Sequence, residues 1–75
     1  MIRIKGTRNY IDVYIENKVV RIHGEIIVGG FVAFKDTIRN WHVPEGVPIT
    51  EKEKEEIIVK VIEKTQGSHF IITFE

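Results

Sequence analysis

Few folds are compatible with the strict alternation of apolar and polar residues over positions 10–16 of this 75-residue chain. The apolar members are Ile11, Val13 and Ile15, and the members between and around them are Tyr10, Asp12, Tyr14 and Glu16. A period of two is that of a β-strand with one face in a core and the other in water. Val20 and Ile22 continue the apolar set after a polar break, so the sequence predicts a β-hairpin.

A two-residue turn at Asn17-Lys18 is the simplest connection between these strands. With that turn, apolar residues meet apolar residues on one face and polar residues meet polar residues on the other. The predicted pairs are Ile15 with Val20, Val13 with Ile22, Tyr14 with Arg21, and Asp12 with His23.

Three further segments have strand character. Residues 2–5 alternate and stop at Gly6, which predicts a short strand. Gly24-Glu25 interrupts the pattern before the apolar run 26–28, and Gly29-Gly30 then predicts a second tight hairpin into residues 31–34. Because these runs are apolar on both sides, we expect both strands at the sheet centre, covered on at least one face.

The clearest helix signal begins at Thr50, which is followed three residues later by Glu53, the pattern of a capping box. Upstream, Asp36 is suited to cap a single helical turn, and residues 44–48 predict a loop. The helix carries an apolar stripe at Ile57, Ile58, Val61 and Ile62, and Gly67 is expected to end it as a left-handed cap. Residues 69–74 predict a final strand with Phe70, Ile72 and Phe74 on one face.

These elements predict one α+β domain over residues 1–75, an antiparallel sheet of five to six strands with one C-terminal helix packed on it, in the order β-β-β-β-β-α-β. Without cysteine, a disulfide framework and a thiolate zinc site are excluded. The longest apolar run, residues 26–28, is far shorter than a membrane span. The N-terminus lacks the apolar region of a signal peptide, so we expect a cytoplasmic protein that does not bind membranes.

The charge is zero overall but unevenly placed. Residues 1–44 carry seven basic and four acidic side chains (+3), and residues 45–75 carry four and seven (−3). The basic half interleaves cations with aromatic residues, which allows a small nucleic-acid-binding module that uses Tyr10, Tyr14 and Arg21. The acidic run 51–56 is either a solvated helix start or a docking surface for a basic partner.

Reactive constellations are sparse. His23, His42 and His69 have no metal-ligand spacing, so we expect no metal and no cofactor. Glu25 is either a polar residue at a strand kink or, if half-buried, a base with a raised pKa beside His23. The absence of any other acid–base arrangement predicts that the chain is not an enzyme.

Trp41 lies in the irregular segment 39–44. It serves either as a lid over the open end of a small core or as an exposed anchor at an interface, where Trp is enriched. The first interpretation is favoured, because a core this small needs every large side chain that the chain has.

The order of these features resembles a known family. An alternating hairpin leads through Gly24-Glu25 and a Gly-rich turn into an aromatic strand, and Ile38-x-x-Trp41 and a Pro44 loop follow. Ile49-Thr50 then opens an acidic helix with Ile57-Ile58, and the chain ends in Phe74-Glu75. This arrangement, from Arg3 to Glu75, is similar to the immunity protein 74 family of bacterial polymorphic toxin systems, which include contact-dependent growth inhibition systems.

The resemblance implies a protein that binds and neutralises a cognate toxin domain by non-covalent blockade, without catalysis. Such toxins are often nucleases with basic substrate grooves, for which the acidic helix face is a natural counter-surface. The residues expected at the contact are Glu51, Glu55, Trp41, Glu25 and Tyr14. We expect a monomer or weak dimer in the absence of the toxin, and no role for nucleic acid as a partner.

Overall fold

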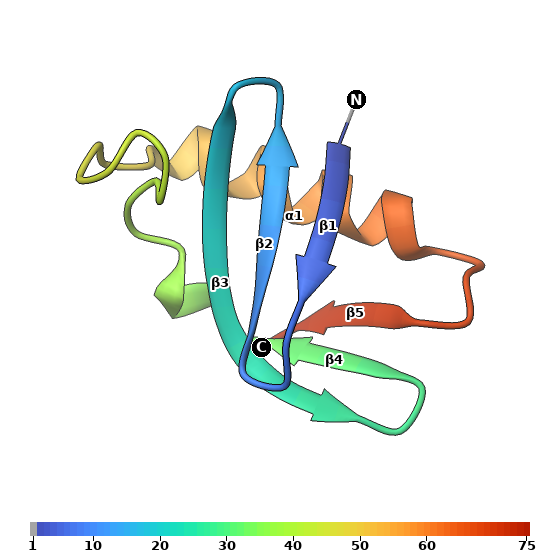
Figure 1. The fold of residues 1–75 in the computed structure, drawn as a ribbon. Helices are drawn as coiled ribbons and strands as arrows, with labels where there is room; N and C mark the ends of the chain where they lie inside the picture. The colour runs from blue at the N-terminus through green and yellow to red at the C-terminus, as the bar shows by residue number, and fades with distance from the viewer. Residues whose placement is uncertain (1) are drawn as a thin grey trace.

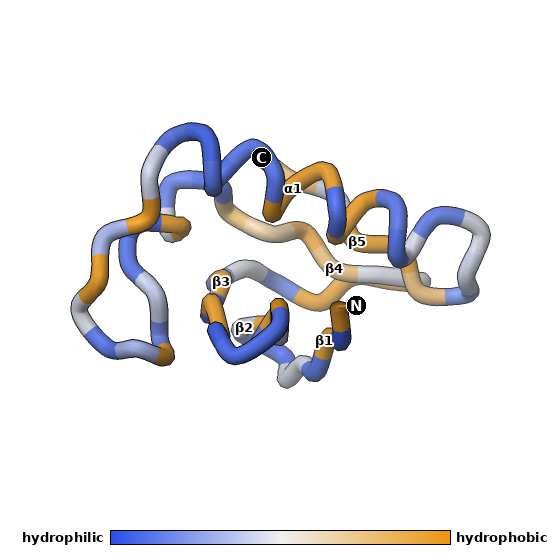
Figure 2. Tube along the Cα trace, turned by 90° about the horizontal axis from the view of Figure 1, so that it is seen from above, coloured by the Kyte–Doolittle hydropathy of each residue, from blue (hydrophilic) through white to orange (hydrophobic). Residues whose placement is uncertain are grey.

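The computed structural model describes residues 2–75, which form a five-stranded sheet with one helix packed on it (Figure 1). The elements are β1 (Ile2–Gly6), β2 (Tyr10–Ile15), β3 (Lys18–Ile27), β4 (Gly30–Ala33), a 3₁₀ turn (Lys35–Thr37), α1 (Glu51–Thr65) and β5 (Ile71–Phe74). The strands lie in the sheet in chain order, β1-β2-β3-β4-β5. Seen from above, the helix and the sheet form two layers (Figure 2).

The α+β class, the single helix near the C-terminus and the strand after it are confirmed. Two details differ from the expectation. The predicted strands on either side of Gly24-Glu25 form one continuous strand, β3, so four strands precede the helix. The sheet is mixed rather than antiparallel throughout, because α1 carries the chain back across the sheet before β5 and so lets β5 run parallel to β4.

The first hairpin forms, but its predicted register is wrong by two residues. Val13 pairs with Val20 and Ile15 with Lys18, so the two-residue turn is Glu16-Asn17. On the polar face, Asp12 lies opposite Arg21 instead of His23. A shift of two keeps every side chain on its predicted face, so the alternation alone could not choose between the two registers. Bidentate pairing of Asp12 with Arg21 and direct Val13–Val20 packing favour the observed one.

Strand β3 belongs to both halves of the sheet and bends between them (Figure 1). Its first part pairs with β2 and its last four residues pair with β4. Gly24 stands at the change of partner, where a Cβ atom would overlap the carbonyl oxygen of Val32 and the ring of Phe31. The interruption of the sequence pattern at Gly24 therefore marks a close approach within one strand rather than the end of a strand.

The second hairpin forms, but its two-residue turn is Val28-Gly29, with Gly29 at a φ of 79°, instead of the predicted Gly29-Gly30. Gly30 begins β4, where a Cβ atom would overlap the carbonyl oxygen of Ile71. The expected cover is only partly present. Phe31 and Ala33 of β4 are fully buried, whereas Ile26, Ile27 and Val28 at the end of β3 and in the turn are 52%, 48% and 104% exposed. The β4 strand of this hairpin is therefore covered, whereas the end of β3 and the turn leave apolar surface exposed.

Helix α1 begins as predicted. The Thr50 hydroxyl accepts a hydrogen bond from the Glu53 N–H at 3.1 Å, and the Glu53 carboxylate accepts one from the Thr50 N–H at 3.0 Å. At the other end Gly67 has a φ of 81°, and the Ser68 N–H donates to the Thr65 carbonyl at 3.1 Å. Those values are typical of a type II turn, so Gly67 ends the helix with a left-handed residue in a turn directly after it.

The core lies between α1 and the facing side of the sheet. It consists of Ile11, Val13, Val20, Ile22, Phe31, Ala33 and Ile72 from the sheet, Ile57 and Val61 from the helix, and Ile38 and Trp41 from the connection. Of the predicted helix stripe, Ile62 is 43% exposed. Of the predicted final strand, residues 69 and 70 lie outside β5, and Phe70 is 43% exposed.

The register of the first hairpin makes a prediction about Glu16, which has a φ of 56° in the turn. Replacing Glu16 with glycine should raise the free energy of unfolding by about 0.5–1 kcal/mol in urea denaturation, because glycine accepts a positive φ without strain. Glu16→Ala is the control, since it keeps the Cβ and should give no gain. In the alternative register Glu16 is a strand residue, so destabilisation by Glu16→Gly would contradict the observed turn.

Candidate binding surfaces

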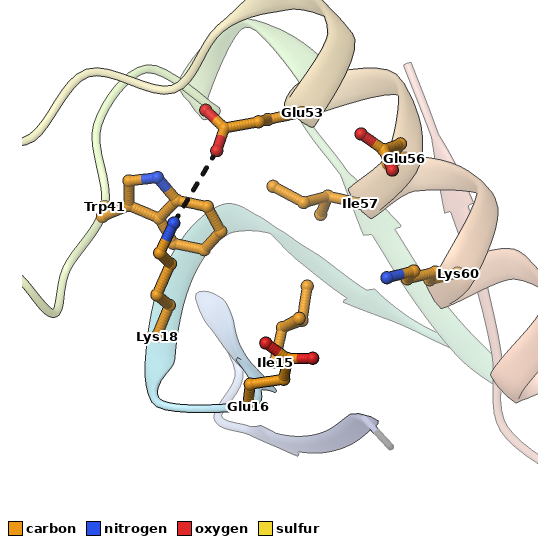
Figure 3. Close-up of a pocket in the computed structure, with 8 residues that line it drawn as sticks. All are labelled: Ile15, Glu16, Lys18, Trp41, Glu53, Glu56, Ile57 and Lys60. Carbon is orange, nitrogen blue, oxygen red and sulfur yellow. Dashed lines mark ion pairs between the residues drawn. The ribbon is translucent and has the colours of Figure 1, made fainter.

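A cleft between the first hairpin and the start of α1 brings several charged side chains together beside the Trp41 ring (Figure 3). Its volume is about 140 Å³, and its lining residues are Ile15, Glu16, Lys18, Trp41, Glu53, Glu56, Ile57 and Lys60. The first residue of β3 is Lys18, the connection before the helix supplies Trp41, and the first turn of α1 supplies Glu53.

Lys18 joins these elements. Its ammonium lies 5.0 Å from the centre of the Trp41 ring and 3.8 Å from a Glu53 carboxylate oxygen. Glu53 uses its other oxygen for the helix cap, so a single carboxylate connects the helix start to the hairpin turn. The pKa of Glu53 is lowered below its ordinary value, mainly by the hydrogen bond from the Thr50 N–H and further by the Thr50 hydroxyl and Lys18. These contacts stabilise the fold, since they connect the helix start to the first hairpin.

Trp41 is 5% exposed and forms part of the core, as the lid interpretation predicts. The backbone N–H of Trp41 donates a hydrogen bond to the Val47 carbonyl at 2.8 Å, which holds the loop before α1 against the Trp41 ring. Because the Trp41 side chain is so deeply buried, a partner can contact only the edge of its ring, which lies beside Lys18.

The outer face of the first three strands carries a ladder of cations and aromatic rings. Arg21 donates two hydrogen bonds to Asp12, at 2.8 and 3.0 Å, and its guanidinium lies 4.0 Å from the centre of the Tyr10 ring. The hydrogen bond with Asp12 raises the pKa of Arg21 above its ordinary value. Arg3 and Lys5 lie 5.4 and 5.9 Å from the centre of the Tyr14 ring.

This ladder argues against the nucleic-acid alternative. Base stacking needs an open aromatic face, and phosphate binding needs a free cation. Arg21, by contrast, is neutralised by Asp12 and covers Tyr10, so two of the three residues named for that alternative already contact other groups of the fold.

Glu25 and His23 are exposed neighbours on the outer face of β3, two residues apart. The half-buried carboxylate on which the enzyme hypothesis depends is therefore not found. Within residues 2–75, no group of three His, Asp or Glu side chains is arranged to hold a metal ion.

The predicted contact residues do not form one site. Glu51 and Glu55 are exposed one turn apart at the start of α1. Tyr14 and Glu25 lie on the opposite face of the sheet, since they alternate with residues that pack under the helix. A single flat partner cannot cover all five residues, because Glu51 and Glu55 lie on the helix and Tyr14 and Glu25 lie on the far face of the sheet.

The comparison with known families agrees with this architecture. The model of the family described as immunity protein 74 matches residues 3–75. The chain belongs to the immunity protein 74 family. No curated protein and no solved structure matches it.

Membership of an immunity protein family indicates that the function of the chain is to neutralise a toxin. The partner is therefore a toxin protein, and immunity proteins generally act without catalysis. No helix among the described residues is long and apolar enough to cross a membrane.

The Glu53 contacts make a pH-dependent prediction. Its pKa is lower in the folded chain than in the unfolded chain, so the stabilisation is complete above the unfolded value of about 4.3 and is lost as the pH falls through the folded value. Wild-type protein should therefore be more stable than Glu53→Gln at pH 7, and the difference in unfolding free energy should shrink below about pH 4.

Urea denaturation across pH 2.5–7 measures this difference. Glu55→Gln is the matched control, because it removes the same charge from the same helix without touching the cap. A Glu53→Gln difference that stayed constant down to the lowest pH would show that the carboxylate does not stabilise the helix start through its charge.

Proposed function

We propose that this protein binds the toxin domain encoded beside it, and that it blocks the toxin by occupying a surface, with the acidic start of α1 as the main contact. Family membership supplies the toxin partner. The exposed acidic face supports the place of contact. Its carboxylates are Glu51, Glu55, Glu56 and Glu63, set among the exposed Lys52 and Lys60.

The acidic face is available because the fold does not use it. Of the acidic residues in the first two turns, Glu53 serves the cap and the pair with Lys18, whereas Glu51 and Glu55 form no ion pair or side-chain hydrogen bond within residues 2–75. Unpaired exposed carboxylates are suited to steer a basic partner and to pair with it on contact. A nuclease fits this description, since its substrate groove must attract phosphates, and the outcome for the cell is protection from the toxin.

Co-expression with the neighbouring toxin domain tests the proposal. A stable 1:1 complex in size-exclusion chromatography is expected, together with loss of toxin activity in proportion to the immunity protein added. Absence of any complex would contradict neutralisation by binding.

The acidic contact has its own test. The double variant Glu51→Gln/Glu55→Gln should weaken toxin binding by about tenfold or more, and most of the loss should lie in an association rate that falls with added salt. Glu45→Gln/Glu75→Gln removes the same net charge elsewhere and should change the affinity by less than about twofold. Equal effects of the two double variants would show that the start of α1 is not the contact.

A further inference from the structure

The two edges of the sheet are treated differently by the fold. Strand β5 turns the N–H groups of Ile71 and Glu75 towards β4, so the N–H of Ile72 points away from the sheet. That N–H donates to the hydroxyl of Thr65 at 3.3 Å, and the same hydroxyl donates to the Val61 carbonyl at 3.1 Å. The last turn of α1 therefore closes the β5 edge at its centre.

Strand β1, at the other edge, has no such cover (Figure 1). The Thr7 N–H donates to the Tyr10 carbonyl at 2.8 Å, which makes this the first hydrogen-bonded pair of the β1–β2 ladder. Such pairs alternate in an antiparallel ladder, so Lys5 and Arg3 bond to β2. The backbone N–H and C=O groups of Ile4 and Gly6 therefore point outward, and no strand within residues 2–75 lies beside them.

An apolar groove of about 630 Å³ lies against this edge. Ile4 and Gly6 contribute to its wall, and Ile11, Ile26, Phe70 and Ile72 are further apolar residues that line it. Ile26 and Phe70 are 52% and 43% exposed, although both are large apolar side chains. The groove thus offers unpaired backbone groups and uncovered apolar surface at the same place, which is what β-strand addition uses for affinity and for specificity.

The charged side chains around the groove determine which kind of strand can add beside β1. Arg8 and Lys64 are the only charged residues that line the groove, and both are cations. Arg3 and Lys5 are exposed on the outward side of β1. Strand β2 already shows the matching pattern on the other side of β1, where Val13 lies opposite Ile4 and Asp12 opposite Lys5.

We propose that the free edge of β1 is a second toxin-contact site, at which an extended toxin segment with alternating apolar and acidic residues adds as a sixth strand. Its apolar side chains enter the groove, and its carboxylates lie beside Arg3 and Lys5. This inference rests on the proposed function, because the toxin is its partner. Thirteen residues of helix, or about 20 Å, separate Glu51 from Lys64, a span that one interface of ordinary size covers.

A second copy of this chain fits the edge poorly. Antiparallel pairing of two β1 strands about Ile4 keeps the apolar faces together but sets Arg3 of each copy opposite Lys5 of the other. Like charges directly opposite destabilise a strand pair, and this pairing contains two such contacts. The cations of β1 thus disfavour self-association and favour an acidic partner.

Hydrogen exchange of the unmodified protein, free and in complex with the toxin domain, tests the site directly. The amides of Ile4 and Gly6 should exchange at least about tenfold more slowly in the complex than in the free protein. If the complex forms and both amides exchange as fast as before, the strand site is refuted while the neutralising function stands. If no complex forms, both proposals fail. A free protein that is dimeric with both amides protected would also overturn the inference, since a second copy would then fill the edge.

Gly6→Pro and Gly6→Ala form a matched pair of variants. Both add a Cβ that meets a methyl group of Ile11 at 3.1 Å, but only proline removes the outward N–H. Toxin binding should be about tenfold weaker for Gly6→Pro than for Gly6→Ala. Equal affinities of two folded variants would contradict strand addition at this position, and the exchange measurement decides the matter if the proline variant does not fold.

The charge requirement is tested by Arg3→Glu, with Lys35→Glu as a control of equal charge change at an exposed position away from the groove. Arg3→Glu should weaken toxin binding at least about fivefold more than Lys35→Glu. Equal weakening by both variants would refute an acidic strand beside β1.

Discussion

The close packing of Phe31 across Gly24 is the contact on which the rest of this fold depends. A strand of ten residues that pairs with β2 at one end and β4 at the other must bend, and the bend brings Phe31 over the position where a Cβ atom is missing. Phe31 is fully buried and lies in the same row as Ile72, so the site that lets β3 bend also holds β4 and β5 against the core. With a side chain at position 24, Phe31 and the backbone of β4 would have to move away from β3.

The helix is attached to this sheet at its two ends by different chemistry. At the start, Glu53 combines the cap with the ion pair to Lys18, over the buried ring of Trp41. The Lys18–Glu53 ion pair is exposed and by itself contributes little to the free energy of folding. It nevertheless orients the hairpin turn, whose neighbouring side chains are apolar. At the end, a single buried hydroxyl, that of Thr65, links the helix to the edge of β5. Between these points Ile57 and Val61 supply the apolar contact, so the helix needs only one narrow stripe and leaves the rest of its surface free.

Much of this could be predicted from the sequence because it depends on local periodicity. The faces of the residues in β1 and β2, the capping box at Thr50 and a hairpin near Gly29 follow from patterns of two to four residues, although the turn of that hairpin lies one residue earlier than predicted. The register of the first hairpin could not be predicted in this way, because both candidate registers keep Ile11, Val13 and Ile15 inward. The choice depends on a contact across the strands, that of Asp12 with Arg21. The parallel β4–β5 pairing and the edge position of β1 depend on the order of strands in space, which no local pattern encodes. For that reason the contact residues proposed from the sequence were spread over two faces, and Ile4 and Gly6 were missed.

A protein that acts by covering a surface of its partner should pair its polar and charged groups with one another wherever it can. It should leave unpaired only those groups that form hydrogen bonds or ion pairs with the partner. The outer ladder follows the first rule: Arg21, Asp12 and Tyr10 contact one another and need nothing further. The acidic start of α1 and the edge of β1 are the open positions that we propose a partner completes. Thr65 shows how a single hydroxyl closes β5, and Lys18 shows how a single amine pairs with an exposed carboxylate. The contrast between these closed and open positions, rather than any one side chain, supports our proposal that the two surfaces contact the toxin.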